Sequence, residues 1–102
     1  MGFRFVDGPM KTSQALLSHA ERRVRTALAR VADRVTRVEV HVVDDNGPKG
    51  GTDKRCSIVA NIAGMGQIAV DQMSSDFFRA VDLAAGKLRR ATEHHVARAR
   101  HG

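Results

Sequence analysis

Residues 36–43 have the sequence Thr-Arg-Val-Glu-Val-His-Val-Val, in which valines alternate with charged or polar side chains. This period of two predicts a β-strand with one buried apolar face and one face open to water. The alternation returns in residues 55–62, and residues 68–73 have the composition of a third strand. The segments between them, 44–53 and 64–66, are rich in turn formers. We therefore expect these three strands to form an antiparallel meander.

Segments with a helical period flank the meander on both sides. From Ala15 to about Val35 apolar residues recur at steps of three and four, and Thr12 or Ser13 can cap the start of this helix. Its expected apolar stripe comprises Leu16, Ala20, Val24, Ala27, Leu28, Val31 and Val35. A second helix is expected after residues 74–76, which offer N-cap side chains. Its expected apolar stripe comprises Phe77, Phe78, Val81, Ala84, Ala85, Leu88 and Val96.

A short strand at residues 3–6, ended by Asp7-Gly8-Pro9, completes the order β-α-β-β-β-α. Each helix has one apolar stripe and each strand has one apolar face. We therefore expect an α+β fold of two layers, a four-stranded mixed sheet with two helices packed on one face. With 102 residues, the chain is expected to form a single domain over residues 1–102. Residues 97–102 are expected to be disordered.

The composition limits the class of partner. The formal net charge is +6 and the pI is about 10.7, which favours an anionic partner, either nucleic acid or an acidic membrane surface. No apolar run approaches the roughly 18 residues of a membrane span, and we expect no signal peptide. Cys56 is the single cysteine, so no internal disulfide can form, which fits a reducing compartment. We expect a cytoplasmic protein.

Cations gather on one side of the second helix. At 100° per residue they fall in a sector roughly 100° wide, nearly opposite the apolar stripe, with Asp76 as the one acid in that sector. A row of cations at this spacing can meet successive phosphates and release their counterions. A face made basic for solubility is the alternative, but such faces usually mix both signs. The row comprises Arg79, Lys87, Arg90, His94 and Arg98.

The first helix adds further arginines, for which Glu21 and Asp33 are available as local partners, so local ion pairs remain an open alternative. If the helices pack side by side, both basic faces join into one RNA-binding surface. From the first helix this surface would include Arg22, Arg23, Arg25 and Arg30. The chain has four phenylalanines and no tyrosine or tryptophan, and Phe77 and Phe78 are expected in the core. Recognition should therefore depend on shape and phosphate, as for double-helical RNA.

No motif indicates catalysis or metal binding. Residues 47–51 are rich in glycine but lack the Gly-Lys-Ser/Thr of a phosphate loop. His94 and His95 are adjacent, so they point about 100° apart on a helix and cannot chelate one ion together. Cys56 is expected on the buried face of its strand. We expect neither an enzyme nor a cofactor, and no small-molecule substrate.

Several stretches together resemble the family of ribosome hibernation-promoting factors and ribosome-associated translation inhibitors, in its short, sigma-54 modulation protein-like form. The resemblance rests on Thr36–Val42, Asp45–Gly47, Asp53–Cys56, Ser75–Asp82, and Lys87-Leu88 followed by Arg90. It implies a fold related to double-stranded-RNA-binding domains. It also implies binding to the small ribosomal subunit, in the channel of the mRNA and the tRNA anticodon ends, where occupation blocks initiation and protects idle ribosomes. The family's basic positions correspond to Arg23, Lys87 and Arg90.

The sequence also departs from the family pattern. The given sequence ends after the second helix, so we expect the short form, without the dimerisation domain of the long form or the acidic tail of the inhibitor form, and ribosome pairing stays open. The family's aromatic residue in the first helix is absent, and Phe78 replaces the usual tyrosine of the last. We expect a monomer. Two alternatives remain: a general RNA-binding or RNA-chaperone module of the same shape, and a protein-interaction module that uses the wet sheet face with Arg37, Glu39, His41, Arg55 and Asn61.

Overall fold

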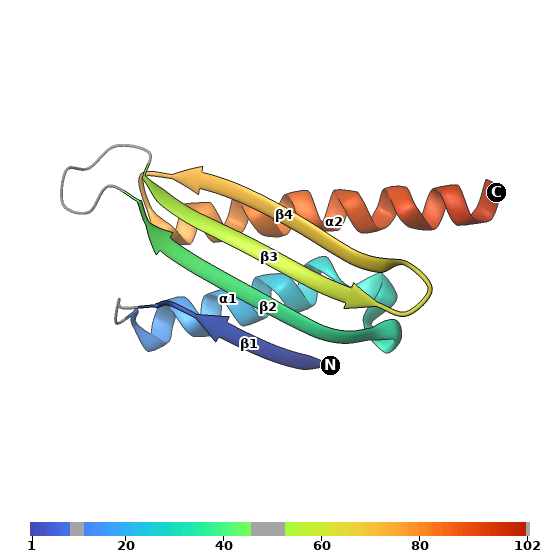
Figure 1. The fold of residues 1–102 in the computed structure, drawn as a ribbon, viewed down its shortest axis with the longest axis horizontal. Helices are drawn as coiled ribbons and strands as arrows, with labels where there is room; N and C mark the ends of the chain where they lie inside the picture. The colour runs from blue at the N-terminus through green and yellow to red at the C-terminus, as the bar shows by residue number, and fades with distance from the viewer. Residues whose placement is uncertain (9–11, 46–52, 102) are drawn as a thin grey trace.

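The computed structural model describes residues 1–8, 12–45 and 53–101, with side chains up to residue 95. Within these ranges it confirms the predicted element order (Figure 1). A short 3₁₀ helix, η1, follows the first α-helix. The elements are β1 (Gly2–Val6), α1 (Gln14–Ala27), η1 (Ala29–Arg34), β2 (Val35–Asp44), β3 (Lys54–Ile62), β4 (Gly66–Ser74) and α2 (Phe77–His101).

The strands form one mixed sheet in the order β1-β2-β3-β4. β1 runs parallel to β2, and β2, β3 and β4 form the predicted antiparallel meander. Both α-helices lie on the same face of this sheet, behind it in Figure 1. The structure therefore confirms the two-layer α+β arrangement, and none of the elements in the described ranges covers the other face of the sheet.

The core lies between the sheet and the helical layer, which comprises α1, η1 and α2. Val40 pairs in register with Ile58, which pairs with Val70, so three neighbouring strands supply one apolar row. Val24 of α1 and Leu88 of α2 are fully buried in the same cluster. The apolar side chains of the alternating pattern therefore face the core, as the sequence predicts.

Side-chain caps begin both α-helices at the predicted places. Ser13 is the N-cap of α1, where its hydroxyl accepts a hydrogen bond from the Leu16 N–H at 3.1 Å. The Asp76 carboxylate accepts a hydrogen bond from the Phe78 N–H at 3.3 Å at the start of α2. Both caps satisfy backbone donors that have no partner inside the helix.

The predicted single helix to about Val35 is wrong, because α1 ends at Ala27. Leu28 has φ −101° and ψ 10°, and Val31 has φ −121° and ψ 17°, which are not α-helical angles. Leu28 and Val31 are nevertheless buried, so the three- and four-residue steps continue through η1 without an α-helix. This tighter path brings the chain to Val35, the first residue of β2. As a result Arg30 lies on η1 and not on α1.

Two further expectations need correction. Phe78 was expected in the core, but its side chain is 39% exposed. The loop was predicted at residues 44–53, but Asp44 is the last residue of β2. Asp53, at the other end of that loop, is fully buried beside Lys54. Residues 46–52 lie outside the described residues. The predicted reversal at 64–66 is confirmed, and its glycines at 64 and 66 both have positive φ.

Two leucines of α2 offer a matched test of the layered fold. Leu88→Ala should lower the free energy of unfolding by about 2–5 kcal/mol, because a fully buried side chain leaves a cavity. Leu83→Ala, at an exposed position on the same helix, should change it by less than about 0.5 kcal/mol. Urea unfolding followed by far-ultraviolet circular dichroism measures both. Equal losses in the two variants would contradict the orientation of α2.

Candidate nucleic-acid interface

Cations on the uncovered face of the sheet have carboxylate neighbours. Arg37 Nη2 lies 2.8 Å from Glu39 Oε1, and Arg4 Nη1 lies 3.7 Å from the same oxygen. A hydrogen bond from His41, together with the charges of Arg37 and Arg4, holds the pKa of Glu39 below its ordinary value. The Glu39 carboxylate therefore neutralises part of the charge of cations on both β1 and β2.

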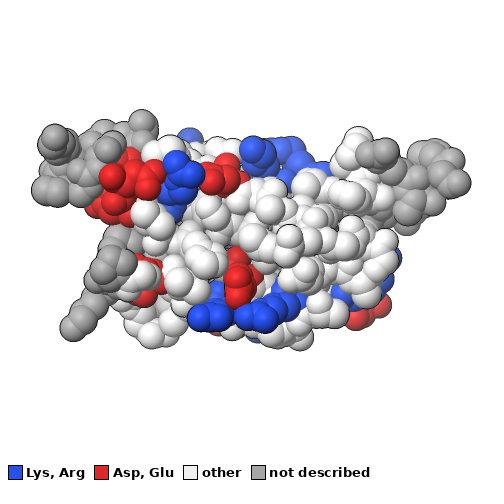
Figure 2. All heavy atoms as spheres, in the orientation of Figure 1, with Lys and Arg blue, Asp and Glu red and all other residues white. Residues whose placement is uncertain are grey.

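The same pairing occurs near the end of β2. Arg55 lies 3.1 Å from both Asp45 and Asp71. Lys54 lies on the helix-facing side of the sheet, over the Phe77 ring of α2. It is 2.9 Å from Asp44 and 3.1 Å from the buried Asp53, and hydrogen bonds to these carboxylates raise the pKa of Lys54. Figure 2 shows the uncovered face, where red and blue atoms lie next to each other and large areas are uncharged. The uncovered sheet face therefore carries little unbalanced charge.

The helical layer differs from the sheet face. Among the side chains of residues 1–8, 12–45 and 53–95, several exposed cations of this layer have no carboxylate within 4.0 Å. Arg79 and Arg90 are eleven residues apart on α2, so they lie on one side of the helix, roughly 16 Å apart along its axis. The helical layer therefore carries the excess positive charge. Its unpaired cations are Arg22, Arg30, Arg34, Arg79, Lys87 and Arg90.

The remaining predicted contacts are placed differently. Arg25 Nη2 lies 2.8 Å from Glu21 Oε2, which is the local pairing left open above. Arg23 Nε lies 3.1 Å from Asp82 Oδ1 of α2. Lys87 lines a shallow hollow with residues of β3 and β4, so it lies at the β4 edge of the layer. His94 is exposed, and Arg98 lies beyond the described side chains.

A small polar cluster joins α1 to α2. His19 Nε2 lies 2.7 Å from Asp82 Oδ1, and Arg22 Nη2 lies 3.3 Å from His19 Nδ1. A neutral ring protonated on Nε2 satisfies both contacts, because it donates to Asp82 and accepts from Arg22. The His19 ring also lies 5.2 Å from the Phe78 ring. Local sequence patterns could not predict this cluster, because His19 and Asp82 are 63 positions apart.

The described residues include neither a reactive thiol nor a cluster of metal ligands. Cys56 is fully buried, and this burial raises the pKa of its thiol to about 12, so the thiolate is scarce at neutral pH. Across the described residues, no group of three or more His, Cys, Asp or Glu side chains could hold a metal ion. No helix in the same ranges has the length and apolar content needed to cross a membrane.

The thiol provides a test of this burial. At pH 8 the folded protein should react with a maleimide far more slowly than the protein in urea, because the folded thiol is both protonated and inaccessible. Mass spectrometry of timed samples measures the modified fraction. A rate in native buffer equal to the rate in urea would show that β3 is not covered by the helices.

These features define a small basic α+β domain with its excess charge on one helical layer. Residues 6–100 match the family model described as sigma 54 modulation protein / S30EA ribosomal protein. The chain therefore belongs to this family of ribosome-associated factors, which confirms the resemblance seen in the sequence.

Solved structures show the same fold. The N-terminal domain of Protein Y from Thermus thermophilus matches with a TM-score of 0.74 at 17% identity, over 92% of this chain and 98% of that one. A ribosomal subunit interface protein from Coxiella burnetii matches with a TM-score of 0.76 at 20% identity, over 95% of this chain and 99% of that one. No curated protein sequence matches this chain.

Proposed function

We propose that this protein binds the small ribosomal subunit through its helical layer, in the channel that holds the mRNA and the tRNA anticodon ends. Occupation of the channel inhibits translation by steric exclusion and keeps idle ribosomes in a protected state during stress or stationary phase. Family membership supports association with the ribosome. The observation that carries the choice of surface is the charge distribution, with unpaired cations on the helical layer and paired cations on the sheet face.

The affinity comes from phosphate neutralisation. Arg22, Arg79 and Arg90 form the centre of the proposed surface, because these arginines can bind phosphates without first breaking an ion pair with a carboxylate. Arg30 lies at its edge, on η1. Arg23 and Arg25 contribute after they exchange their carboxylate for a phosphate, and Lys87, His94 and Arg98 extend the surface along α2. No cofactor or chemical step is needed. The protein acts in the cytoplasm as a monomer.

The surface suits folded RNA better than extended single strands. Phe78 is the one exposed phenylalanine in the described part of the helical layer, and His19 already contacts its ring. Binding of single strands usually depends on successive aromatic stacking platforms. A rigid helical layer with cations at fixed intervals instead suits the fixed phosphate positions of ribosomal RNA.

Substitution of the two outward arginines of α2 tests the surface. Arg79→Gln with Arg90→Gln should weaken co-sedimentation with small subunits. The slope of log K against log salt should flatten by about two units, one for each lost phosphate contact. The matched control is Arg4→Gln with Arg37→Gln, which removes the same charge from the sheet face. Equal effects of the two double variants would show that only net charge matters and would contradict the assigned surface.

A general RNA-binding module would use the same cations, so the partner needs a separate test. We expect at least a tenfold higher affinity for intact small subunits than for a random RNA duplex at the same salt concentration. Filter binding at several salt concentrations measures both. Equal affinities would favour a general RNA-binding or RNA-chaperone role.

The uncovered sheet face supports the remaining alternative, a protein-interaction module. Val43 and Met73 are 45% and 37% exposed on it. Should Val43→Thr with Met73→Gln abolish ribosome association while the α2 double variant keeps it, binding would belong to the sheet face.

A further inference from the structure

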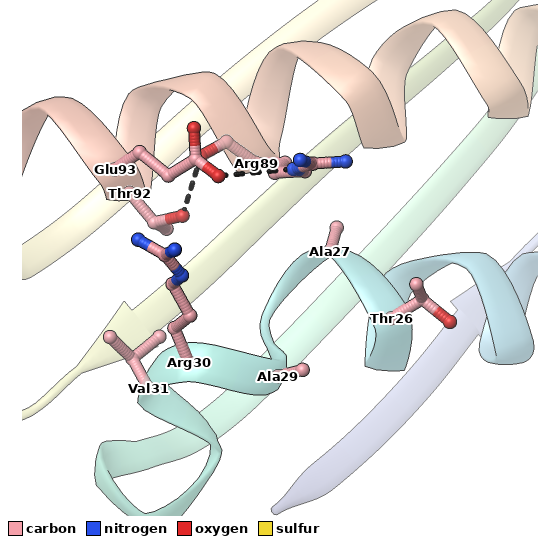
Figure 3. Close-up of a pocket in the computed structure, with 8 residues that line it drawn as sticks. All are labelled: Thr26, Ala27, Ala29, Arg30, Val31, Arg89, Thr92 and Glu93. Atoms are coloured by element: carbon pink, nitrogen blue, oxygen red, sulfur yellow. Dashed lines mark hydrogen bonds and ion pairs between the residues drawn. The ribbon is translucent and has the colours of Figure 1, made fainter.

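A hollow of about 210 Å³ lies where η1 faces α2 (Figure 3). One side of the hollow is formed by η1 and by the last turn of α1. The other side is formed by residues 89–93 of α2. Its volume is below the roughly 300–1,000 Å³ of sites for drug-sized ligands. The hollow therefore suits a single flat ring system better than an extended ligand.

The floor of the hollow consists of apolar side chains and of one hydroxyl that already has a hydrogen-bond partner. Ala27 and Val31 are buried there, and the Thr92 hydroxyl donates a hydrogen bond to the Arg89 carbonyl at 2.8 Å. A bound ring would therefore meet mainly apolar atoms at the base. Its polar edges would be recognised by the charged side chains at the rim.

The rim carries both signs of charge. Glu93 Oε1 accepts a hydrogen bond from Arg89 Nε at 3.0 Å. Arg30 extends from η1 toward α2 in Figure 3, and it forms no ion pair with any carboxylate in the described part of the chain. The hollow thus offers a carboxylate acceptor and an unpaired guanidinium donor within one small space.

This combination suits a base better than a phosphate. A phosphate could use the guanidinium groups of Arg30 and Arg89 but would also lie near the Glu93 carboxylate, whereas a base can use both signs of charge. A carboxylate instead needs a ligand edge with N–H donors, and Arg30 needs an edge with acceptors. Guanine has both, because N1–H and the N2 amino group are adjacent donors, and O6 and N7 are the acceptors that arginine binds bidentately. Adenine would turn the N1 lone pair toward the carboxylate.

We propose that this hollow binds one unpaired guanine of the RNA, with Glu93 as acceptor for its N1–H and N2 amino group and Arg30 as donor to its acceptor edge. The site rests on the proposed function, because it reads a base of the RNA that the helical layer binds through phosphates.

Kethoxal footprinting on small subunits tests the site, because this reagent modifies N1 and N2 of unpaired guanines. Wild-type protein should protect at least one guanine. Glu93→Gln, which keeps the shape but loses the charge and one acceptor, should restore that guanine's reactivity to the level of free subunits. Arg30→Gln should restore the same guanine. Co-sedimentation and the other protections should persist in Glu93→Gln.

Glu21→Gln is the matched control, because Glu21 also pairs with an arginine four positions away on an exposed helix face. It makes the same charge change outside the hollow and should leave the footprint unchanged. Intact co-sedimentation without a guanine that depends on Glu93 would overturn the guanine site alone. Protection from dimethyl sulfate at an adenine or cytosine that depends on Glu93 would overturn the choice of base. Failure of the wild-type protein to co-sediment would overturn the proposed function and the site with it.

Discussion

The apolar inner face of the sheet must be removed from water, and this requirement determines where the rest of the molecule lies. β1 runs parallel to β2, so the chain must cross over the sheet between them, and α1 with η1 forms that crossover. α2 returns over the same face after β4. Both helices therefore turn their apolar stripes toward one core, and their charged sides toward solvent.

Charged side chains are paired on the uncovered face of the sheet but largely unpaired on the outward side of the helices. Neighbouring side chains on one face of a sheet lie roughly 4.5–8 Å apart, within reach of long opposite charges. Arg55 accordingly meets Asp71 across the β3–β4 pair. On α2 the acids Asp82 and Glu93 engage His19, Arg23 and Arg89, in or near the contact between helices. The outward arginines keep their full charge.

The sequence predicted those features that depend on local periodicity. The alternation around Val40 was enough to identify β2 and its buried side, and single residues such as Ser13 identified helix starts. The end of α1 could not be predicted, because the spacing of Leu28 and Val31 fits an α-helix, although the chain buries both side chains on a different path. The charge patch was only half predictable. The row on α2 follows from its period, whereas the neutralisation of Arg23 depends on Asp82 of another helix.

The wrong prediction for the end of α1 also explains why the sequence did not predict the hollow. In a continuous α-helix, Arg30 would be one cation in a row with Arg23. The turn into η1 instead places Arg30 across from Glu93, so a position that looked like a phosphate contact faces a carboxylate. In the proposed function, phosphate contacts would hold the helical layer on RNA, but such contacts do not depend on the sequence of bases. A point on the layer that accepts the edge of one base would then fix the position of the domain along that RNA.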